Sequence, residues 1–376
     1  MKITAAVLDR CGIGAPYAES RPLRLAGLEL TPPRPGELLL RIEAAGVCHS
    51  DLSVVNGDRV RPMPMALGHE AVGTVLATGS TDSAFAVGDR VVLAFLPACG
   101  RCVACASGEG YLCPSAAAAN GRGDLLGGGC RLSEDDAVVH HHLGVSAFAS
   151  HAVVDERSAV RIDADIPAEV AALFGCAVLT GVGAVVNAAA VRPGESVVVF
   201  GLGGVGLAAV MGALASGAQP VVAVDPVAAK VDLARALGAV GVDPTGAATA
   251  CAALPRGGAD VAIETVGKAA ALADAYRATR RGGRTVTVGL PNPLEMLSIP
   301  AISLVADGKT LLGSYMGNAI PRRDIPRYIA LWRAGHLPVE RLLSATRPLA
   351  EINAALDDLA SGAAIRQVMI PEPPPS

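Results

Sequence analysis

The sequence has little net charge and no cluster of basic residues. Its 376 residues include 31 lysines and arginines and 35 aspartates and glutamates, which gives a formal net charge of −4. A protein that binds nucleic acid through its phosphates usually carries a basic patch or stripe. The dispersed basic residues therefore exclude a nucleic-acid partner of that kind. The length is sufficient for two domains, each with its own core.

The sequence also lacks a segment typical of a secretory leader or a membrane anchor. Only six uncharged residues separate Lys2 from Asp9, fewer than the core of a signal peptide needs. Residues 196–224 carry no charged side chain and are long enough to span a bilayer. However, the glycines of GLGGVG and Pro220 interrupt this run and favour a buried strand, a turn and a helix. We expect a cytoplasmic chain with no membrane partner.

Disulfide bonds are not expected, although the chain has nine cysteines. The count is odd and no secretory signal is recognisable, whereas disulfide frameworks are typical of small secreted domains. In a long intracellular chain, clustered thiols more often bind a metal.

Four of the cysteines lie within the stretch CGRCVACASGEGYLC at residues 99–113. The C-x-x-C-x-x-C spacing is compatible with an iron–sulfur cluster, although in the bacterial ferredoxin pattern the fourth cysteine follows about four residues after the third. Here that gap is eight residues. A tetrahedral zinc site accepts four thiolates from one compact loop. The spacing therefore favours a closed, structural zinc site formed by Cys99, Cys102, Cys105 and Cys113.

The sequence has no tandem repeat, and its pattern changes near Arg192. Residues 1–95 and 149–162 are short apolar segments separated by Gly-Asp and Pro-Gly turns, which predict a compact β-barrel-like unit. Residues 115–147 are expected to be a loop-rich insertion. From Arg192 onward, apolar strands alternate with helices, which predicts a parallel doubly wound sheet. The predicted class is therefore α/β.

The motif GLGGVG at residues 201–206 follows a predicted strand and opens a predicted helix. In this context Gly201 permits a tight turn, Gly203 lets a pyrophosphate approach the backbone, and Gly206 lets the helix pack on the strand. Asp225 ends the next predicted strand. Its carboxylate can accept hydrogen bonds from both adenosine ribose hydroxyls and would repel a 2′-phosphate, so the sequence predicts NAD rather than NADP.

A second possible metal site is spread along the first half of the chain. Cys48, His69 and Cys176 could supply two thiolates and one imidazole to a single zinc and leave a fourth position open, as catalytic zinc sites do. Each residue alone is more often a small core residue or a turn histidine. The interpretation depends on all three occurring together with the four-cysteine stretch and the glycine motif.

Taken together, these motifs resemble those of the zinc-dependent medium-chain alcohol dehydrogenases, in the branch that includes the liver enzyme. The resemblance extends over residues 3–370 and rests on GHE at 68–70, the four cysteines, GLGGVG, Asp225 with Lys230, and IRQVMI near the end. It implies a GroES-like β-barrel catalytic domain at residues 1–177 and 316–376, with a structural-zinc lobe at 97–114. A Rossmann NAD-binding domain would occupy residues 178–315. Each chain would hold two zinc ions, one catalytic and one structural, and NAD.

The resemblance also implies roles for single residues. Cys48, His69 and Cys176 would bind the catalytic zinc, and Ser50 would bind the substrate oxygen. Asp51 and Glu70 would orient the zinc ligands. The residues expected at NAD are His49, Thr180, Gly201, Gly203, Gly204, Val205, Gly206, Asp225, Lys230, Val288 and Arg366. The expected substrate pocket comprises Phe95, Ala118, His142, Leu143, Leu290 and Tyr315, with Arg59 as a further polar neighbour.

The sequence departs from the family pattern at three places. His49 stands where many relatives have an arginine on the pyrophosphate, which removes a permanent charge. Ser53 stands where liver-type members have a histidine that passes a proton to solvent. Residues 115–119, SAAAA, lack the arginine of glutathione-linked formaldehyde dehydrogenases, which argues against that subclass.

The sequence therefore predicts reversible, NAD-dependent oxidation of primary medium-chain or aromatic alcohols to aldehydes by a homodimer or homotetramer. A nicotinoprotein that never releases its NAD would share every motif, as would a polyol or aryl-alcohol enzyme. A non-catalytic NAD-binding relative and a zinc-free quinone reductase are alternatives from other classes. Both are opposed by the open metal set of Cys48, His69 and Cys176.

Overall fold

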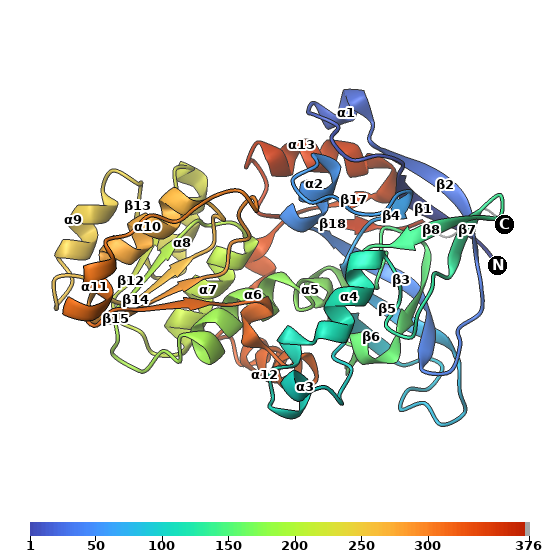
Figure 1. The fold of residues 1–376 in the computed structure, drawn as a ribbon, viewed down its shortest axis with the longest axis horizontal. Helices are drawn as coiled ribbons and strands as arrows, with labels where there is room; N and C mark the ends of the chain where they lie inside the picture. The colour runs from blue at the N-terminus through green and yellow to red at the C-terminus, as the bar shows by residue number, and fades with distance from the viewer. Residues whose placement is uncertain (373–376) are drawn as a thin grey trace. The chain divides into compact units, whose positions relative to one another are not determined.

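The computed structural model describes residues 1–372, which form two compact units (Figure 1). The first contains Met1–Cys176, Ile320–Ile325 and the chain from Leu343 onward. The second contains Ala177–Ala319 and Pro326–Leu342. Thus residues 177, 316–319 and 326–342, which we expected in the catalytic domain, belong to the second unit. There, Tyr328 accepts a hydrogen bond of 3.4 Å from Asn187 Nδ2, and the short helix η5 (Val339–Leu342) packs on α7 (Gly204–Ala215).

The first unit contains two β-sheets, as the short apolar segments predicted. The smaller sheet is a closed barrel in the order β1-β2-β7-β8-β4, formed by Lys2–Leu8, Leu23–Leu30, Leu132–Glu134, Ala137–His141 and Met65–Ala66. The larger runs β10-β6-β5-β3-β18-β17, formed by Ala159–Ile162, Arg90–Leu93, Glu70–Thr78, Glu37–Val47, Arg366–Ile370 and Leu343–Pro348. In addition, β9 (His151–Asp155) pairs with β3. Neighbouring strands in both sheets come from distant parts of the sequence. Residues far apart along the chain therefore lie close together where these strands end.

Short helices connect these strands and carry several candidate site residues. They are α1 (Tyr17–Ser20), α2 (His49–Val55), α3 (Val103–Ala106), α4 (Pro114–Arg122), α5 (Ala168–Leu173) and α13 (Ile352–Ala360), with the single-turn helices η1 (Gly110–Leu112), η2 (Glu156–Ser158) and η6 (Leu349–Glu351). Helix α2 follows β3 after one residue, and α5 ends just before Cys176. Aliphatic side chains of β3, β5, α2 and α13 form one continuous buried core.

The second unit is the predicted doubly wound sheet. Its order is β13-β12-β11-β14-β15-β16, formed by Val240–Val242, Val221–Val224, Val197–Phe200, Ala259–Glu264, Thr279–Thr287 and Thr310–Gly313, and every pairing is parallel. The helices are α6 (Ala177–Gly183), α7, α8 (Ala228–Ala236), α9 (Ala247–Ala252), α10 (Ala269–Ala278) and α11 (Ala301–Ala306), with the turns η3 (Ala184–Ala188) and η4 (Met316–Asn318). The strand order reverses between β11 and β14, and a Rossmann sheet binds nucleotides at that point.

Two features differ from the sequence-based expectation. Residues 115–147, expected to be a loop-rich insertion, also contain α4 and the antiparallel pair β7–β8, with loops between them. Helix α4 starts with Pro114 at its first position, where proline is favoured, and continues through four alanines. Helix α12 (Pro321–Arg333) contributes residues to both units. No helix among residues 1–372 is both long and apolar enough to cross a membrane.

Candidate active site

Cys48 is held at the start of helix α2 by a reciprocal capping arrangement. Its side chain accepts from the backbone N–H of Asp51, and Asp51 Oδ2 accepts from the backbone N–H of Cys48 at 3.1 Å. This is the capping-box geometry with a thiol in place of the usual hydroxyl. The sequence C-H-S-D therefore fixes the Cys48 side chain and buries the Asp51 carboxylate beside it.

His69 enters the site from a turn that requires glycine. Gly68 has a φ of +92°, and a Cβ there would lie 2.4 Å from the backbone nitrogen of Phe148. The imidazole of His69 is 1% exposed, and its Nδ1 lies 3.1 Å from Asp51 Oδ1. In the neutral ring, donation from Nδ1 to this carboxylate leaves the lone pair on Nε2. That Nε2 is buried and has no hydrogen-bond partner among residues 1–372.

The donor atoms of Cys48, His69, Glu70 and Cys176 all lie within 4.8 Å of one another. All four residues are buried in the first unit. A hydrogen bond from Cys176 lowers the pKa of the Cys48 thiol, so the pair holds one thiolate readily. Two thiols and an orphaned imidazole nitrogen form the donor set that zinc prefers, so the residues present fit a zinc ion.

Glu70 and Arg366 form a second buried pair behind these donors. Burial raises the pKa of Glu70 to about 7, although Arg366 opposes the shift. Arg366 Nη1 lies 3.6 Å from Glu70 Oε2 and donates a hydrogen bond of 3.0 Å to the carbonyl of Val47, which directly precedes Cys48. Strand β18 thus ties the C-terminal part of the chain to the metal-binding turn.

Asp51 has further contacts besides those with the backbone N–H of Cys48 and the imidazole of His69. Its Oδ1 also accepts from Gly68 N at 3.2 Å and lies 3.1 Å from His142 Nδ1. Burial raises the pKa of Asp51, but the facing histidines outweigh it and hold the pKa at about 2. Burial lowers the pKa of His142. The fully buried Asp51 is therefore an anion between two imidazole rings.

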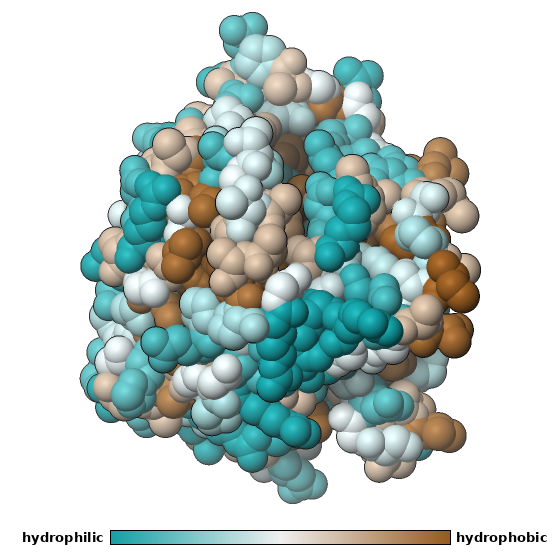
Figure 2. Space-filling view, turned by 90° about the vertical axis from the view of Figure 1, so that its left-hand side faces the viewer, coloured by the Kyte–Doolittle hydropathy of each residue, from teal (hydrophilic) through white to brown (hydrophobic). Residues whose placement is uncertain are grey.

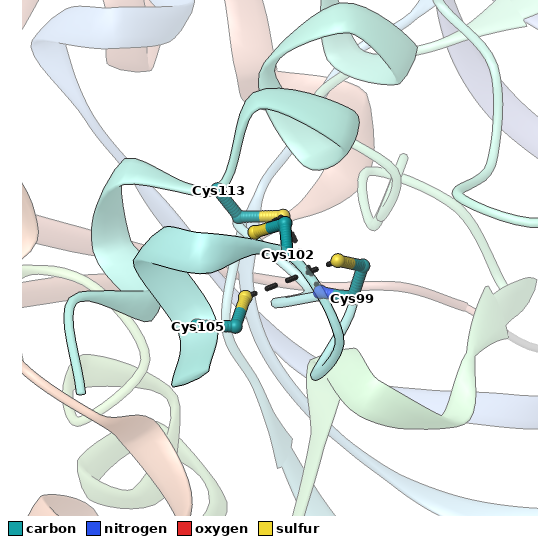
Figure 3. A group of neighbouring side chains, drawn as sticks. All are labelled: Cys99, Cys102, Cys105 and Cys113. Carbon is teal, nitrogen blue, oxygen red and sulfur yellow. Dashed lines mark hydrogen bonds between the residues drawn. The ribbon is translucent and has the colours of Figure 1, made fainter. Parts of the chain in front are cut away.

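The four cysteines of residues 99–113 turn their sulfur atoms toward one another (Figure 3). Cys99 Sγ lies 4.0 Å from Cys105 Sγ, and Cys102 Sγ lies 4.0 Å from Cys113 Sγ. These distances exclude disulfides, whose sulfurs are about 2.05 Å apart. They are close to the edge of a tetrahedron with Zn–S bonds of about 2.3 Å. Therefore the four thiols fit one closed zinc site.

The nucleotide-binding turn has the geometry that its glycines predicted. A Cβ on Gly206 would lie 1.8 Å from the carbonyl oxygen of Gly201, whereas a Cβ on Gly203 would meet nothing within 4 Å. Gly206 is thus required by packing, and Gly203 leaves open space at the start of α7. Asp225 accepts from the backbone N–H groups of Leu202 at 2.7 Å and Val227 at 2.9 Å. Its carboxylate is therefore fixed beside this open space, and the turn fits a dinucleotide.

Comparisons with known proteins agree with this geometry. Residues 34–164 match the alcohol dehydrogenase GroES-like domain, and residues 204–333 match the zinc-binding dehydrogenase domain. An NDMA-dependent alcohol dehydrogenase of Amycolatopsis methanolica is 36% identical and is aligned over 98% of this chain and 99% of its own. The chain belongs to the zinc-type medium-chain alcohol dehydrogenases.

Two solved structures extend the comparison. Benzyl alcohol dehydrogenase of Acinetobacter calcoaceticus superimposes with a TM-score of 0.91 at 30% identity, over 99% of this chain and 100% of its own. A protein of Sinorhizobium meliloti described as a zinc-binding dehydrogenase, solved with NADP, has a TM-score of 0.80 at 25% identity, with coverages of 99% and 100%. Both the GroES-like and the Rossmann predictions are thus confirmed for this alcohol dehydrogenase.

The structure places the other predicted residues of this alcohol dehydrogenase as follows. In the first unit, Ser50 is half-buried with Oγ 3.9 Å from Cys48 Sγ, His49 is exposed, and Phe95 packs edge-on against the His69 ring, with centroids 5.6 Å apart. Leu143 is buried, Ala118 is exposed on α4, and Arg59 is half-buried. In the second unit, predicted residues lie on α6, at the start of α7, on α8, after β15 and after β16: Thr180, Gly204, Val205, Lys230, Val288, Leu290 and Tyr315.

Two contacts of this alcohol dehydrogenase were missed by sequence reasoning. Asn120 on α4 donates from Nδ2 to the carbonyl of Phe95 at 2.9 Å, which fixes the backbone of a predicted pocket residue. His142, predicted only as a pocket neighbour, lies against Asp51. Neither contact has a local sequence signal, because each joins segments brought together by the sheets.

Proposed function

We propose that this protein oxidises alcohols to aldehydes with a catalytic zinc held by Cys48, His69 and Cys176 and with NAD as hydride acceptor. The observation that carries the proposal is the buried Nε2 of His69, which has no hydrogen-bond partner in the described part of the chain and whose ring converges with two thiols. An unpaired buried nitrogen is costly unless something binds it. A bound metal removes that cost.

The residues around the metal position have distinct tasks. Zinc supplies Lewis acidity toward the alcohol oxygen, and NAD accepts the hydride. Asp51 holds His69 in the tautomer whose Nε2 can bind metal. Ser50 Oγ, 3.9 Å from Cys48 Sγ, would relay the proton of the alcohol: it accepts that proton and gives up its own hydroxyl proton toward the coenzyme ribose and solvent. The products are the aldehyde, NADH and one proton, so the atoms and charges balance.

NAD is proposed over NADP because the carboxylate of Asp225 lies beside the open start of α7. Its two oxygens are held by backbone N–H groups and retain lone pairs for ribose hydroxyls. A 2′-phosphate at the same place would face a negative charge. The NADP-bound relative does not decide the question for this chain, because coenzyme choice follows from this one carboxylate.

The proposed substrates are medium-chain or aromatic primary alcohols. The apolar side chains of Phe95 and Leu143 and the small Ala118 favour a roomy hydrophobic pocket, and benzyl alcohol dehydrogenase is a close structural neighbour. Each buried methylene is worth about 1–3 kcal/mol in specificity. We expect benzyl alcohol and hexanol to exceed ethanol at least about tenfold in kcat/KM.

An alcohol panel followed by NADH absorbance tests this proposal, with zinc content measured on the same preparation. Cys176→Ser is the matched variant, and it should lose the catalytic zinc and the activity together. Activity of the zinc-free protein would contradict the metal role. Equal kcat/KM for ethanol and benzyl alcohol would contradict the pocket.

The name of the Amycolatopsis relative supports a second candidate. That enzyme is called NDMA-dependent, so an external acceptor could also reoxidise the coenzyme of this protein in place. In that case NAD would copurify and would not exchange. A spectrum of the purified protein and a search for NAD after heat denaturation separate the two candidates before any assay.

We also propose that two or four copies assemble through the second unit. Several large apolar side chains between residues 290 and 305 are strongly exposed, namely Leu294, Met296, Ile302 and Val305. They precede β16, which is an edge strand of the parallel sheet. Figure 2, viewed from the side on which α9 and α11 lie in Figure 1, shows hydrophobic residues gathered at one edge of the surface. Light scattering of the purified protein measures the assembly.

A further inference from the structure

The side chain of His142 is buried at a place where a hydrophobic residue would be expected. It is 1% exposed and lies just after β8. Its main chain is fixed, because its N–H donates to Ser146 Oγ at 2.9 Å and its carbonyl accepts from Val145 N at 3.0 Å. A buried imidazole held this firmly needs a polar partner. Asp51 Oδ1 lies 3.1 Å from its Nδ1, which is an ion-pair distance without the alignment of a hydrogen bond, since Nδ1 has no hydrogen-bond partner among residues 1–372.

Two imidazole rings therefore share one carboxylate oxygen. His69 Nδ1 and His142 Nδ1 each lie 3.1 Å from Asp51 Oδ1, and the two rings stand edge-to-face with centroids 5.3 Å apart. The other oxygen, Oδ2, is occupied by the backbone N–H of Cys48. Asp51 is fully buried, so its charge is stabilised only by such neighbours, which also include the backbone N–H of Gly68 at 3.2 Å from Oδ1. Loss of one donor would leave the carboxylate less firmly placed.

We propose that His142 is a positioning residue of the zinc site, which holds Asp51 so that Asp51 in turn orients His69. This rests on the proposed zinc-binding function. Groups that hold the outer nitrogen of a metal-binding histidine typically change metal affinity about 10- to 100-fold when removed. His142 acts one contact further out, through the same carboxylate oxygen. The role differs from that of a substrate-pocket residue, which would change KM and leave zinc binding unaltered.

The test uses substitutions that keep or remove a polar atom at the position of Nδ1. His142→Asn places its side-chain amide nitrogen near the former Nδ1, whereas the longer His142→Gln side chain places it near the former Nε2. His141→Gln is the control: His141 is also buried, but its Nε2 accepts from Arg131 N at 3.0 Å, and a glutamine oxygen can replace that acceptor. Zinc release into a chelator is measured for each purified protein, with the lobe zinc as internal reference.

We expect His142→Gln to release one of its two zinc ions faster than wild type, within the range of about 10- to 100-fold. His142→Asn and His141→Gln should release zinc as wild type does. Equal release by the Asn and Gln variants of His142, or wild-type retention by His142→Gln, would overturn the proposal. Should His142→Gln fail to fold, His142→Phe, which keeps a ring of similar size, replaces it in the comparison.

The experiment also separates this proposal from the proposed function. If wild-type protein holds zinc only in the lobe, the catalytic-zinc proposal is wrong. If wild-type protein holds two zinc ions and all variants match it, the zinc proposal stands and the role of His142 is wrong. Cobalt substituted for zinc gives a second readout, because its visible bands respond to the geometry of the ligands. Only His142→Gln should change those bands.

Discussion

At the scale of single residues, the candidate metal donors were predictable and the contacts behind them were not. Cys48, His69 and Cys176 belong to a recognisable set of donors, and the structure brings them together. The contact of His142 with Asp51 depends on the parallel pairing of β4 with β8, which sets Met65 opposite His140 and Ala66 opposite His141. Such a pairing joins segments far apart in sequence, so no local sequence pattern predicts the contact.

The predicted preference for NAD over NADP depends on one carboxylate, that of Asp225. Asp225→Gly should weaken NAD binding and relax discrimination against NADP, because a hydrogen bond to a charged group is worth about 1.5–3 kcal/mol. That corresponds to tenfold or more in the dissociation constant, measured for both coenzymes by fluorescence. Asp225→Asn is the control, since it removes the charge and keeps an acceptor for the ribose. A wild-type preference for NADP would rule out this assignment.

The pH dependence of stability should include a contribution from His141. Burial, assisted by Arg131, lowers the pKa of His141 to about 3, whereas an unfolded histidine has a pKa of about 6.5. Between these values the unfolded state binds more protons, so stability rises with pH and is lost as the pH falls below about 6.5. The loss approaches about 1.4 kcal/mol per pH unit.

His141→Gln should remove that contribution. The difference in the free energy of unfolding between wild type and variant should therefore change in favour of the variant by about 1.4 kcal/mol between pH 7.5 and pH 5.5. Urea titrations at both pH values measure it, and the effect of pH on the zinc sites is common to both proteins. An unchanged difference would mean that His141 is protonated in the folded protein.

At the scale of elements, the strands of the second unit were the most predictable part. VVVF and VVAV are continuous runs of apolar residues, as expected for parallel strands covered on both faces. Helix α2 was not predicted, because it has only seven residues and its cap is a cysteine. Helix α4 was not predicted, because the glycines around this segment indicated a loop and outweighed the helix-start signal of its first residue, a proline. Short elements that depend on tertiary contacts leave weak patterns.

The turn before α7 gives a paired prediction. Gly206→Ala should destabilise the protein by about 1–3 kcal/mol, because its Cβ would overlap the carbonyl oxygen of Gly201. Gly203→Ala should leave the thermal stability of the coenzyme-free protein unchanged, since its Cβ would meet open space, but it should weaken NAD binding. Calorimetry and coenzyme titration on both variants check this. Equal stability of the two would contradict the packing role assigned to Gly206.

At the scale of the whole molecule, the sequence predicted two domains, and the structure has two units whose division differs at residue 177, at residues 316–319 and, over the longest segment, at residues 326–342. That segment could not be assigned from its own pattern, since an amphipathic helix such as α12 can cover either unit. The two proposed metal sites both belong to the first unit, and they differ in their surroundings. The candidate catalytic ligands are buried in a core, whereas in residues 99–113 only Cys113 is buried.

This difference predicts that the two zinc ions leave in separate phases with different consequences. The lobe has almost no core of its own, so zinc binding and folding of the lobe share one free energy. The catalytic set has three protein ligands and an open position, which a chelator can enter first. Removal of the first zinc should abolish activity and lower the melting temperature less than removal of the second does, because the catalytic ligands remain buried in an existing core. Cys102→Ser, which removes only the lobe zinc, should reproduce the second change and cost several kcal/mol.

Metal analysis and calorimetry along a chelator titration measure both phases. Loss of both ions in a single phase, or a Cys102→Ser protein with one zinc fewer and wild-type stability, would contradict the structural role of the lobe.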